Sequence, residues 1–139
     1  DAAMEINKIG STSFSTFGVS ASGLGVHKFW LDAIADNVAN VNTVRSTDQP
    51  AFQERFVLVS SVDGGGVQVT GAEFGSADGL LTYEPGHPLA DENGMVRRPD
   101  IDLGEQMVYM IEAQRAYQAN ASVFERARAA YESMLNIGR

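Results

Sequence analysis

The feature that most constrains the fold is a long seven-residue repeat in the C-terminal part of the chain. Positions spaced alternately by four and three residues are occupied mainly by apolar or aromatic side chains. They are Leu103, Met107, Met110, Gln114, Tyr117, Ala121, Phe124, Arg128, Tyr131 and Leu135. This spacing puts them on one face of an α-helix and is typical of a coiled-coil seam. The repeat therefore predicts a long helix whose apolar stripe needs a partner.

The residues at both ends of this repeat agree with a helix over residues 102–137. Pro99 precedes the start, Asp102 is a candidate N-cap with Glu105 three residues later, and Gly138 is placed to end the helix. At about 1.5 Å per residue the helix would be roughly 50 Å long. A compact chain of 139 residues has a diameter near 40 Å. The helix must therefore protrude from any compact body.

A second apolar stripe predicts a helix in the N-terminal part, over residues 13–43. Its members recur every seven residues or fill the intermediate places; they are Leu24, Leu31, Ile34, Val38 and Val41. Phe29 and Trp30 lie outside this stripe, so the helix has apolar surface on more than one side. We expect one partner helix to leave part of that surface uncovered.

Asparagine is concentrated at the end of this N-terminal helix, at Asn37, Asn40 and Asn42. Asparagine is a mediocre helix former that favours helix ends. One interpretation is a helix that runs into its C-cap. The other is that these amides contact neighbouring subunits.

The middle of the chain, residues 44–101, predicts a small β unit of three or four strands. The run 56–59 and the alternating run 67–70 flank Gly64-Gly65-Gly66, which indicates a hairpin, and residues 80–83 could add a strand. Regular structure must then be interrupted by Pro85, Gly86, His87 and Pro88. We expect these four residues to form the joint between the β unit and the long C-terminal helix.

These elements predict a single α+β domain. The long terminal helices would pair as a coiled-coil-like hairpin, because each has an apolar stripe and no other long helix is available. The β unit would project between them as a separate knob.

Charge and composition exclude several classes of function. The formal net charge is −8 and the basic residues are scattered, which argues against nucleic-acid binding. There is no apolar run long enough for membrane insertion, no cleavable secretory signal, and no cysteine for disulfides or thiolate metal sites.

Candidate chemical sites are weak. His27 and His87 lack partners at metal-ligand spacing, and Asp91-Glu92-Asn93-Gly94 fits a turn better than a calcium loop. The carboxylates of Asp100 and Asp102 are explained by the start of a helix. We therefore predict no catalytic residues, no cofactor, no metal and no small-molecule substrate. Two alternatives stay open: a helical-hairpin binding or adaptor module, and a small enzyme with a site within residues 85–102.

Several motifs resemble one known family. Residues 21–24 (Ala-Ser-Gly-Leu) with residues 31–43 (Leu-Asp-Ala-Ile-Ala-Asp-Asn-Val-Ala-Asn-Val-Asn-Thr) resemble the N-terminal signature of flagellar rod and hook proteins. Residues 114–120 (Gln-Arg-Ala-Tyr-Gln-Ala-Asn) resemble the C-terminal signature. Residues 83–91, 94–96 and 99–103 are similar to the proximal rod members of that family.

The resemblance implies a structural subunit of the bacterial flagellar proximal rod, a drive shaft that transmits torque from rotor to hook. It implies export through the flagellar type III apparatus without a cleaved signal, and assembly in the periplasmic rod of the basal body. Partners would be other rod proteins and copies of the chain itself.

The residues expected to pack between subunits come from both helices and include two polar members of the C-terminal stripe, whose side chains should face a neighbour or the channel unless they turn to solvent. The full set is Leu24, Leu31, Ile34, Asn37, Val38, Asn40, Asn42, Leu103, Met107, Met110, Gln114, Tyr117, Phe124, Arg128, Tyr131 and Leu135.

Overall fold

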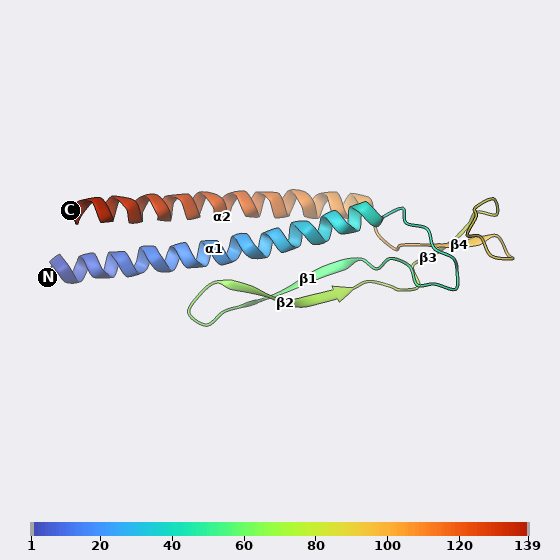
Figure 1. The fold of residues 1–139 in the computed structure, drawn as a ribbon, viewed down its shortest axis with the longest axis horizontal. Helices are drawn as coiled ribbons and strands as arrows, with labels where there is room; N and C mark the ends of the chain where they lie inside the picture. The colour runs from blue at the N-terminus through green and yellow to red at the C-terminus, as the bar shows by residue number, and fades with distance from the viewer. Residues whose placement is uncertain (1, 139) are drawn as a thin grey trace.

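The computed structural model describes residues 2–138, and within them the side chains of Met4, Ser15 and residues 18–138. Two long helices enclose four short strands in the chain order, and the strands form two separate two-stranded sheets (Figure 1). The elements are α1 (Ala2–Asn40), β1 (Arg55–Ser61), β2 (Val67–Phe74), β3 (Leu80–Tyr83), β4 (Met95–Arg98) and α2 (Leu103–Ile137). The predicted α+β class is confirmed.

The two helices lie side by side and antiparallel, with both termini at the same end of the molecule (Figure 1). With 39 and 35 residues they are about 58 Å and 52 Å long at 1.5 Å per residue. The predicted helical hairpin is therefore present. The structure begins α1 at Ala2 rather than near residue 13 and ends it at Asn40 rather than 43, whereas α2 occupies the expected range.

The helix ends are capped by nearby polar groups. The Asp102 carboxylate accepts a hydrogen bond from the Glu105 N–H at 3.1 Å, and the Gly138 N–H donates to the Met134 carbonyl. At the end of α1, the Asn40 side chain donates to the Asp36 carbonyl at 2.9 Å and accepts from the Thr43 hydroxyl at 3.2 Å. Asn40 thus satisfies hydrogen-bonding groups at the end of α1, in agreement with the interpretation that the helix runs into its C-cap.

Strands β1 and β2 form the predicted antiparallel hairpin. All three turn glycines, Gly64, Gly65 and Gly66, have positive φ angles of 92°, 105° and 95°, which side chains other than glycine rarely adopt. The pairing shifts by one residue between Leu58 and Val59. This irregularity is a β-bulge, which increases the local twist of the ribbon.

The β1–β2 hairpin lies along α1, on the side away from α2, and is not a separate knob (Figure 1). Its tip is held because the Ser22 hydroxyl oxygen accepts a hydrogen bond from the Val67 N–H at 3.2 Å. The expectation that this hairpin projects as a separate knob was wrong, because α1 is apolar on two sides. One side packs on α2, and the other, which includes Val26 and Trp30, faces Val57 of the hairpin.

Strands β3 and β4 form a second hairpin beyond the end of the helix pair (Figure 1). The segment after α1 joins its edge, since the backbone groups of Arg45 and Arg97 exchange two hydrogen bonds of 2.9 Å and 2.8 Å. Val96 is fully buried at the centre of this small unit.

The structure places Pro85, Gly86, His87 and Pro88 in the loop between β3 and β4, not at the entrance to α2. The loop is turned by its own contacts: the His87 N–H donates to the Glu84 carbonyl at 3.0 Å, and the Leu89 N–H donates to His87 Nδ1 at 3.0 Å. The expected joint is therefore misplaced, because the prediction of three or four strands placed no strand at residues 95–98. The chain enters α2 through residues 99–102, where Pro99 is buried.

The turn at residues 91–94 closes the same loop. One Asp91 carboxylate oxygen accepts hydrogen bonds from the Asn93 and Met95 N–H groups, both at 2.9 Å, and the other accepts from the Thr47 hydroxyl. The bond from Met95 is the main reason that the pKa of Asp91 lies below its ordinary value. The predicted turn is confirmed.

Candidate functional site

Small and polar residues form the α2 side of the contact between the two helices. Gln106, Ala113 and Ala127 are buried, with exposed fractions of 1%, 0% and 7%, and Asn120 lies opposite Gly23 of α1. We call residues 106, 113, 120 and 127 the inward stripe; they recur every seven residues. A helix presents such a repeat on one face, so this face of α2 meets α1.

The large apolar side chains of the predicted seam lie mostly outside this contact. We call Leu103, Met107, Tyr117, Tyr131 and Leu135 the outward stripe; their exposed fractions run from 39% to 53%. Gln114 and Arg128 are exposed as well, and Arg128 lies 3.6 Å from Glu125 and 3.7 Å from Glu132. Met110 and Phe124 are partly buried and border both stripes. Within one chain, α1 therefore leaves most of the predicted seam uncovered.

The predicted residues of α1 are better enclosed. Ile34 is buried, and Leu24, Leu31 and Val38 are partly buried. Asn42 is exposed just after the helix. The difference arises because α1 packs against both α2 and the hairpin, whereas α2, among the helices and strands of the described residues, packs only against α1.

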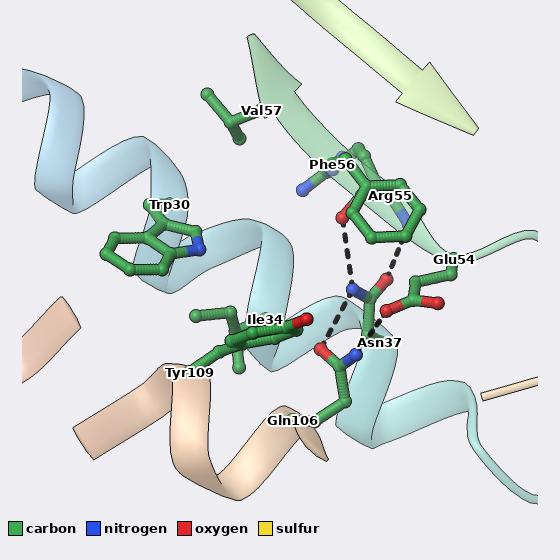
Figure 2. Close-up of a pocket in the computed structure, with 9 residues that line it drawn as sticks. All are labelled: Trp30, Ile34, Asn37, Glu54, Arg55, Phe56, Val57, Gln106 and Tyr109. Carbon is green, nitrogen blue, oxygen red and sulfur yellow. Dashed lines mark hydrogen bonds between the residues drawn. The ribbon is translucent and has the colours of Figure 1, made fainter. Parts of the chain in front are cut away.

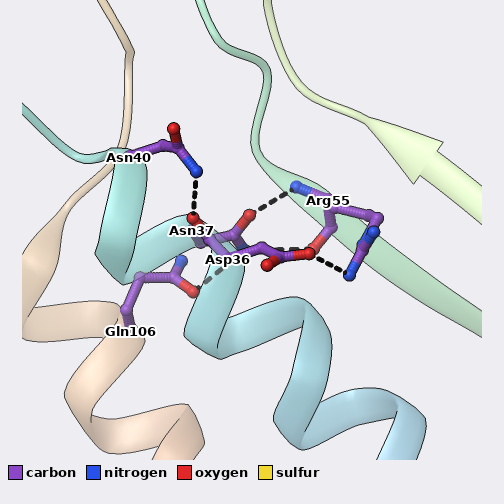
Figure 3. Close-up of polar contacts among 5 residues, drawn as sticks. All are labelled: Asp36, Asn37, Asn40, Arg55 and Gln106. Carbon is purple, nitrogen blue, oxygen red and sulfur yellow. Dashed lines mark hydrogen bonds and ion pairs between the residues drawn. The ribbon is translucent and has the colours of Figure 1, made fainter. Parts of the chain in front are cut away.

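Asn37 is the centre of a buried hydrogen-bond network that joins three parts of the chain (Figure 3). Its Oδ1 accepts from the Arg55 N–H at 2.9 Å, and its Nδ2 donates to the Arg55 carbonyl at 3.1 Å and to Gln106 Oε1 at 3.1 Å. Gln106 Nε2 in turn donates to Glu54 Oε1. Asn37 is only 2% exposed and its amide bonds to Arg55 and Gln106, so the C-cap interpretation is corrected for this residue. Its contact with a neighbouring subunit stays a prediction.

A second polar contact joins the helices nearer their outer ends. The Asn120 amide nitrogen lies 3.1 Å from His27 Nδ1, which is also 2.7 Å from the Gly23 carbonyl oxygen. A Cβ atom on Gly23 would lie 3.0 Å from that amide nitrogen, so the helices approach closely only because residue 23 has no side chain.

Two clefts of about 250 Å³ and 280 Å³ lie between α1 and the hairpin, and Trp30 and Val57 line both. The first, shown in Figure 2, is bordered by the Asn37 network and by Tyr109. Its amide groups are already bonded to one another. Among the described residues, no group of three or more His, Asp or Glu side chains is placed to hold a metal ion.

No described helix is both long and apolar enough to cross a membrane. The longest helix, α1, carries Ser20, Asn37 and Gly23 on its buried face, residues suited to contact with α2 and the hairpin.

Glu54 gives the network a pH dependence. Burial raises the pKa of this carboxyl above its ordinary value of 4.5; the hydrogen bond from Gln106 opposes the rise, and the charges of Glu105 and Asp100 add to it. A raised pKa means that the folded state holds the proton more tightly. The stability that this group contributes is thus complete below the unfolded pKa and is lost as pH rises through the folded pKa.

We expect Glu54→Gln to remove the loss of stability at higher pH, because glutamine still accepts a hydrogen bond from Gln106 and does not ionise. Thermal unfolding from about pH 4 to about pH 7 should show the Tm of the variant rising relative to the parent as pH increases. Glu112→Gln, on the exposed surface of α2, is the control and should follow the parent. Parallel curves for Glu54→Gln and the parent would contradict the expectation.

The seven-residue period of the inward stripe could have been found in the sequence. Gln106, Ala113, Asn120 and Ala127 each precede a member of the predicted seam by one residue. Alanine and amide side chains are weakly hydrophobic, so this repeat was hidden beside the larger side chains of the outward stripe. The spacing of the N-terminal stripe includes His27, three residues after Leu24 and seven before Ile34, but it did not indicate that His27 faces Asn120.

Comparisons with known proteins agree with the helical termini. A family model described as flagellar basal body rod FlgEFG protein C-terminal matches residues 92–137. A flagellar basal-body rod protein FlgC from Borreliella burgdorferi is 32% identical over 146 residues, covering 89% of this chain and 96% of the relative. The protein of the same name from Salmonella typhimurium is 34% identical over 128 residues, with 88% and 96% covered. That from Bacillus subtilis is 26% identical, with 92% and 99% covered.

Proposed function

Because this chain belongs to the family of flagellar basal-body rod proteins FlgC, we propose that it is a structural subunit of the proximal rod and not an enzyme. Its role is to build a shaft that transmits torque from the rotor to the hook. A shaft carries torque only if its subunits cannot slip, which requires helices that share a closely packed core.

The observation that supports this proposal most directly is the outward stripe of α2. Large apolar side chains extend along a helix about 52 Å long and remain about half exposed in the single chain. Apolar surface on this scale is stable when another protein covers it. In a rod subunit the covering surfaces are helices of neighbouring subunits.

The proposed packing residues divide into two groups. On α2 they are the outward stripe with Met110, Phe124, Gln114 and Arg128, the last two being polar positions that could set register between subunits. On α1 they are the partly exposed residues Leu24, Leu31, Val38 and Asn40, together with Asn42 just beyond it. Ile34 and Asn37 support these residues from inside the chain.

The partners we propose are copies of this chain and other rod proteins, in the rod as it crosses the periplasm. The chain would reach it through the flagellar type III export apparatus without a cleaved signal. A chain of two helices and two small hairpins is suited to this route, since it can pass through a narrow channel unfolded and regain its packing on assembly. An adaptor module that binds a partner helix remains the alternative, because the same stripe would serve it.

The test is a pair of charged substitutions in the outward stripe, Tyr117→Asp and Tyr131→Asp. A carboxylate placed in a packed helix contact is strongly unfavourable, so we expect motility and rod assembly to be lost in cells that carry only this variant. Circular dichroism should show an unchanged helix content, since both positions are exposed in the monomer.

Gln118→Asp, also on the exposed surface of α2, is the matched control and should support motility. Normal rods in the double variant would contradict the proposed function. Lost binding to one cytoplasmic partner, with rods intact, would favour the adaptor alternative.

A further inference from the structure

We propose that two polar contacts hold α2 in the rotation that turns its outward stripe away from α1. The contacts are the hydrogen bond between Asn37 and Gln106 and the contact of Asn120 with His27 and Gly23. They prevent the chain from burying its large apolar side chains against its own α1. The use of the stripe in assembly rests on the proposed function, whereas the rotation itself is a property of the single chain.

The two stripes of α2 are close neighbours on the helix surface. Met107 follows Gln106, and consecutive residues of an α-helix differ in direction by about 100°. Met110 and Phe124 border both stripes, so a rotation of α2 about its axis by less than this angle would turn the outward stripe toward α1 in place of the inward stripe. Burial of the outward stripe would remove more apolar surface from water than burial of the inward stripe does. Apolar burial alone therefore favours the opposite rotation.

Rotation would leave buried polar groups without partners. Gln106 would move away from Asn37, which donates to its Oε1 at 3.1 Å, and both side chains are almost fully enclosed. An unpaired buried amide is costly because it has given up its bonds to water. The bond from Gln106 to Glu54 would be lost as well.

The close approach of the helices adds a steric reason. Asn120 fits against α1 at Gly23, where even a single added carbon would lie 3.0 Å from the Asn120 amide nitrogen. Ala113 and Ala127 are buried on the same face and are also small. Tyrosine or methionine in these places would need a wider separation of the helix axes.

The spacing of the two contacts fixes axial register together with rotation. Asn37 and Gly23 are 14 residues apart on α1, and Gln106 and Asn120 are 14 residues apart on α2. This is two seven-residue repeats, or about 21 Å along each helix. The antiparallel helices therefore match at both contacts only in one register.

The test uses cysteine labelling, which is unambiguous because the chain has no cysteine of its own. Single reporters are placed on each stripe, Met107→Cys on the outward stripe and Ala127→Cys on the inward stripe. In the purified monomer of the parent, residue 107 is exposed and residue 127 is buried, so we expect the first thiol to react faster with a maleimide.

In the background Gln106→Ala with Asn120→Ala, the polar contacts are gone, no large apolar side chain is added to the inward stripe, and apolar burial decides the rotation. We expect the ratio of the two labelling rates to fall by about tenfold or more, which corresponds to a change of roughly 1.4 kcal/mol in relative protection. Circular dichroism verifies that the helices remain. If the double variant does not fold, the single variants Gln106→Ala and Asn120→Ala must each lower the ratio.

The matched control is Gln118→Ala with Asn136→Ala, which makes the same two chemical changes at exposed positions of α2. It should leave the labelling ratio of the parent unchanged. A ratio in the Gln106→Ala and Asn120→Ala background equal to that of the parent overturns the inference and leaves the proposed function standing. A lowered ratio supports the inference even where rod assembly is normal, and in that case it is the proposed use of the stripe that fails.

Discussion

Replacing Asn37 by alanine is expected to lower the free energy of unfolding by about 3 kcal/mol, the sum of two or more polar groups left unpaired in a buried site. The Arg55 N–H loses its acceptor, and Gln106 Oε1 loses its donor. The hairpin base and the start of α2 are thus released from α1 together. Both effects are large because the site is closed to water, as the 2% exposure of Asn37 indicates.

Urea unfolding of the purified monomer, followed by circular dichroism, measures this loss. Asn42→Ala is the control: the residue is exposed just beyond α1, and its replacement should change stability by no more than about 0.5 kcal/mol. Equal losses in the two variants would mean that the network contributes nothing particular to the fold. We also expect Asn37→Ala to impair motility, because the hairpin would no longer be held on the helix pair.

Replacing Gly79 by alanine is expected to cost at least about 3 kcal/mol and to disrupt the β3–β4 hairpin. Gly79 has a φ of +54°, and an added Cβ would lie 2.2 Å from the Arg98 carbonyl oxygen and 2.6 Å from the Ala51 Cβ. Neither obstacle can move aside easily, because the first is a backbone atom and the second belongs to an alanine, whose side chain has no rotamers. The strand pair must therefore separate to admit the methyl group.

Amide NMR spectra and urea unfolding together test this expectation, since the damage should centre on residues 44–51 and 77–98 and spare most of the helix pair. Gly86→Ala serves as the control in the neighbouring loop. Gly86 has no atom within 4 Å of an added Cβ and no positive φ, so stability should stay within about 0.5 kcal/mol. A Gly79→Ala protein with the stability and spectrum of the parent would show that the close approach at β3 can relax.

Much of the secondary structure followed from local patterns. Both ends of α2 were predicted to within a residue. The Asp102 cap specifies the start and Gly138 the end, and each acts within one helical turn of the position it specifies. The β1–β2 hairpin was predicted for a similar reason: three consecutive glycines between β-branched runs form a turn from their own conformational preferences. The prediction of three or four strands did not locate β4, because a strand of four residues, two of them arginine, has little apolar alternation of its own.

The candidate site was predicted in part. The periodicity showed which residues of α2 form an apolar stripe, and several of these are exposed in the single chain and proposed for subunit packing. It did not show which face of α2 meets α1, because that depends on contacts between Asn37 and Gln106, 69 residues apart, and between His27 and Asn120, 93 residues apart. The role of the exposed stripe residues in subunit packing stays a prediction.

The sequence by itself determined two long amphipathic helices, a glycine-centred hairpin and a chain with more apolar surface than it can cover alone, because periodicity, caps and turns act over a few residues. Only the tertiary structure decided that the hairpin lies along α1, that Asn37 is internal, that Pro85 to Pro88 lie within the β3–β4 loop, and that α2 turns its larger side chains outward. These choices depend on hydrogen bonds and close contacts between distant segments, such as Asn37 with Arg55 and Gly23 with Asn120. The physical reason is that a buried amide is stable only opposite its partner, and the position of that partner is set by the folded chain.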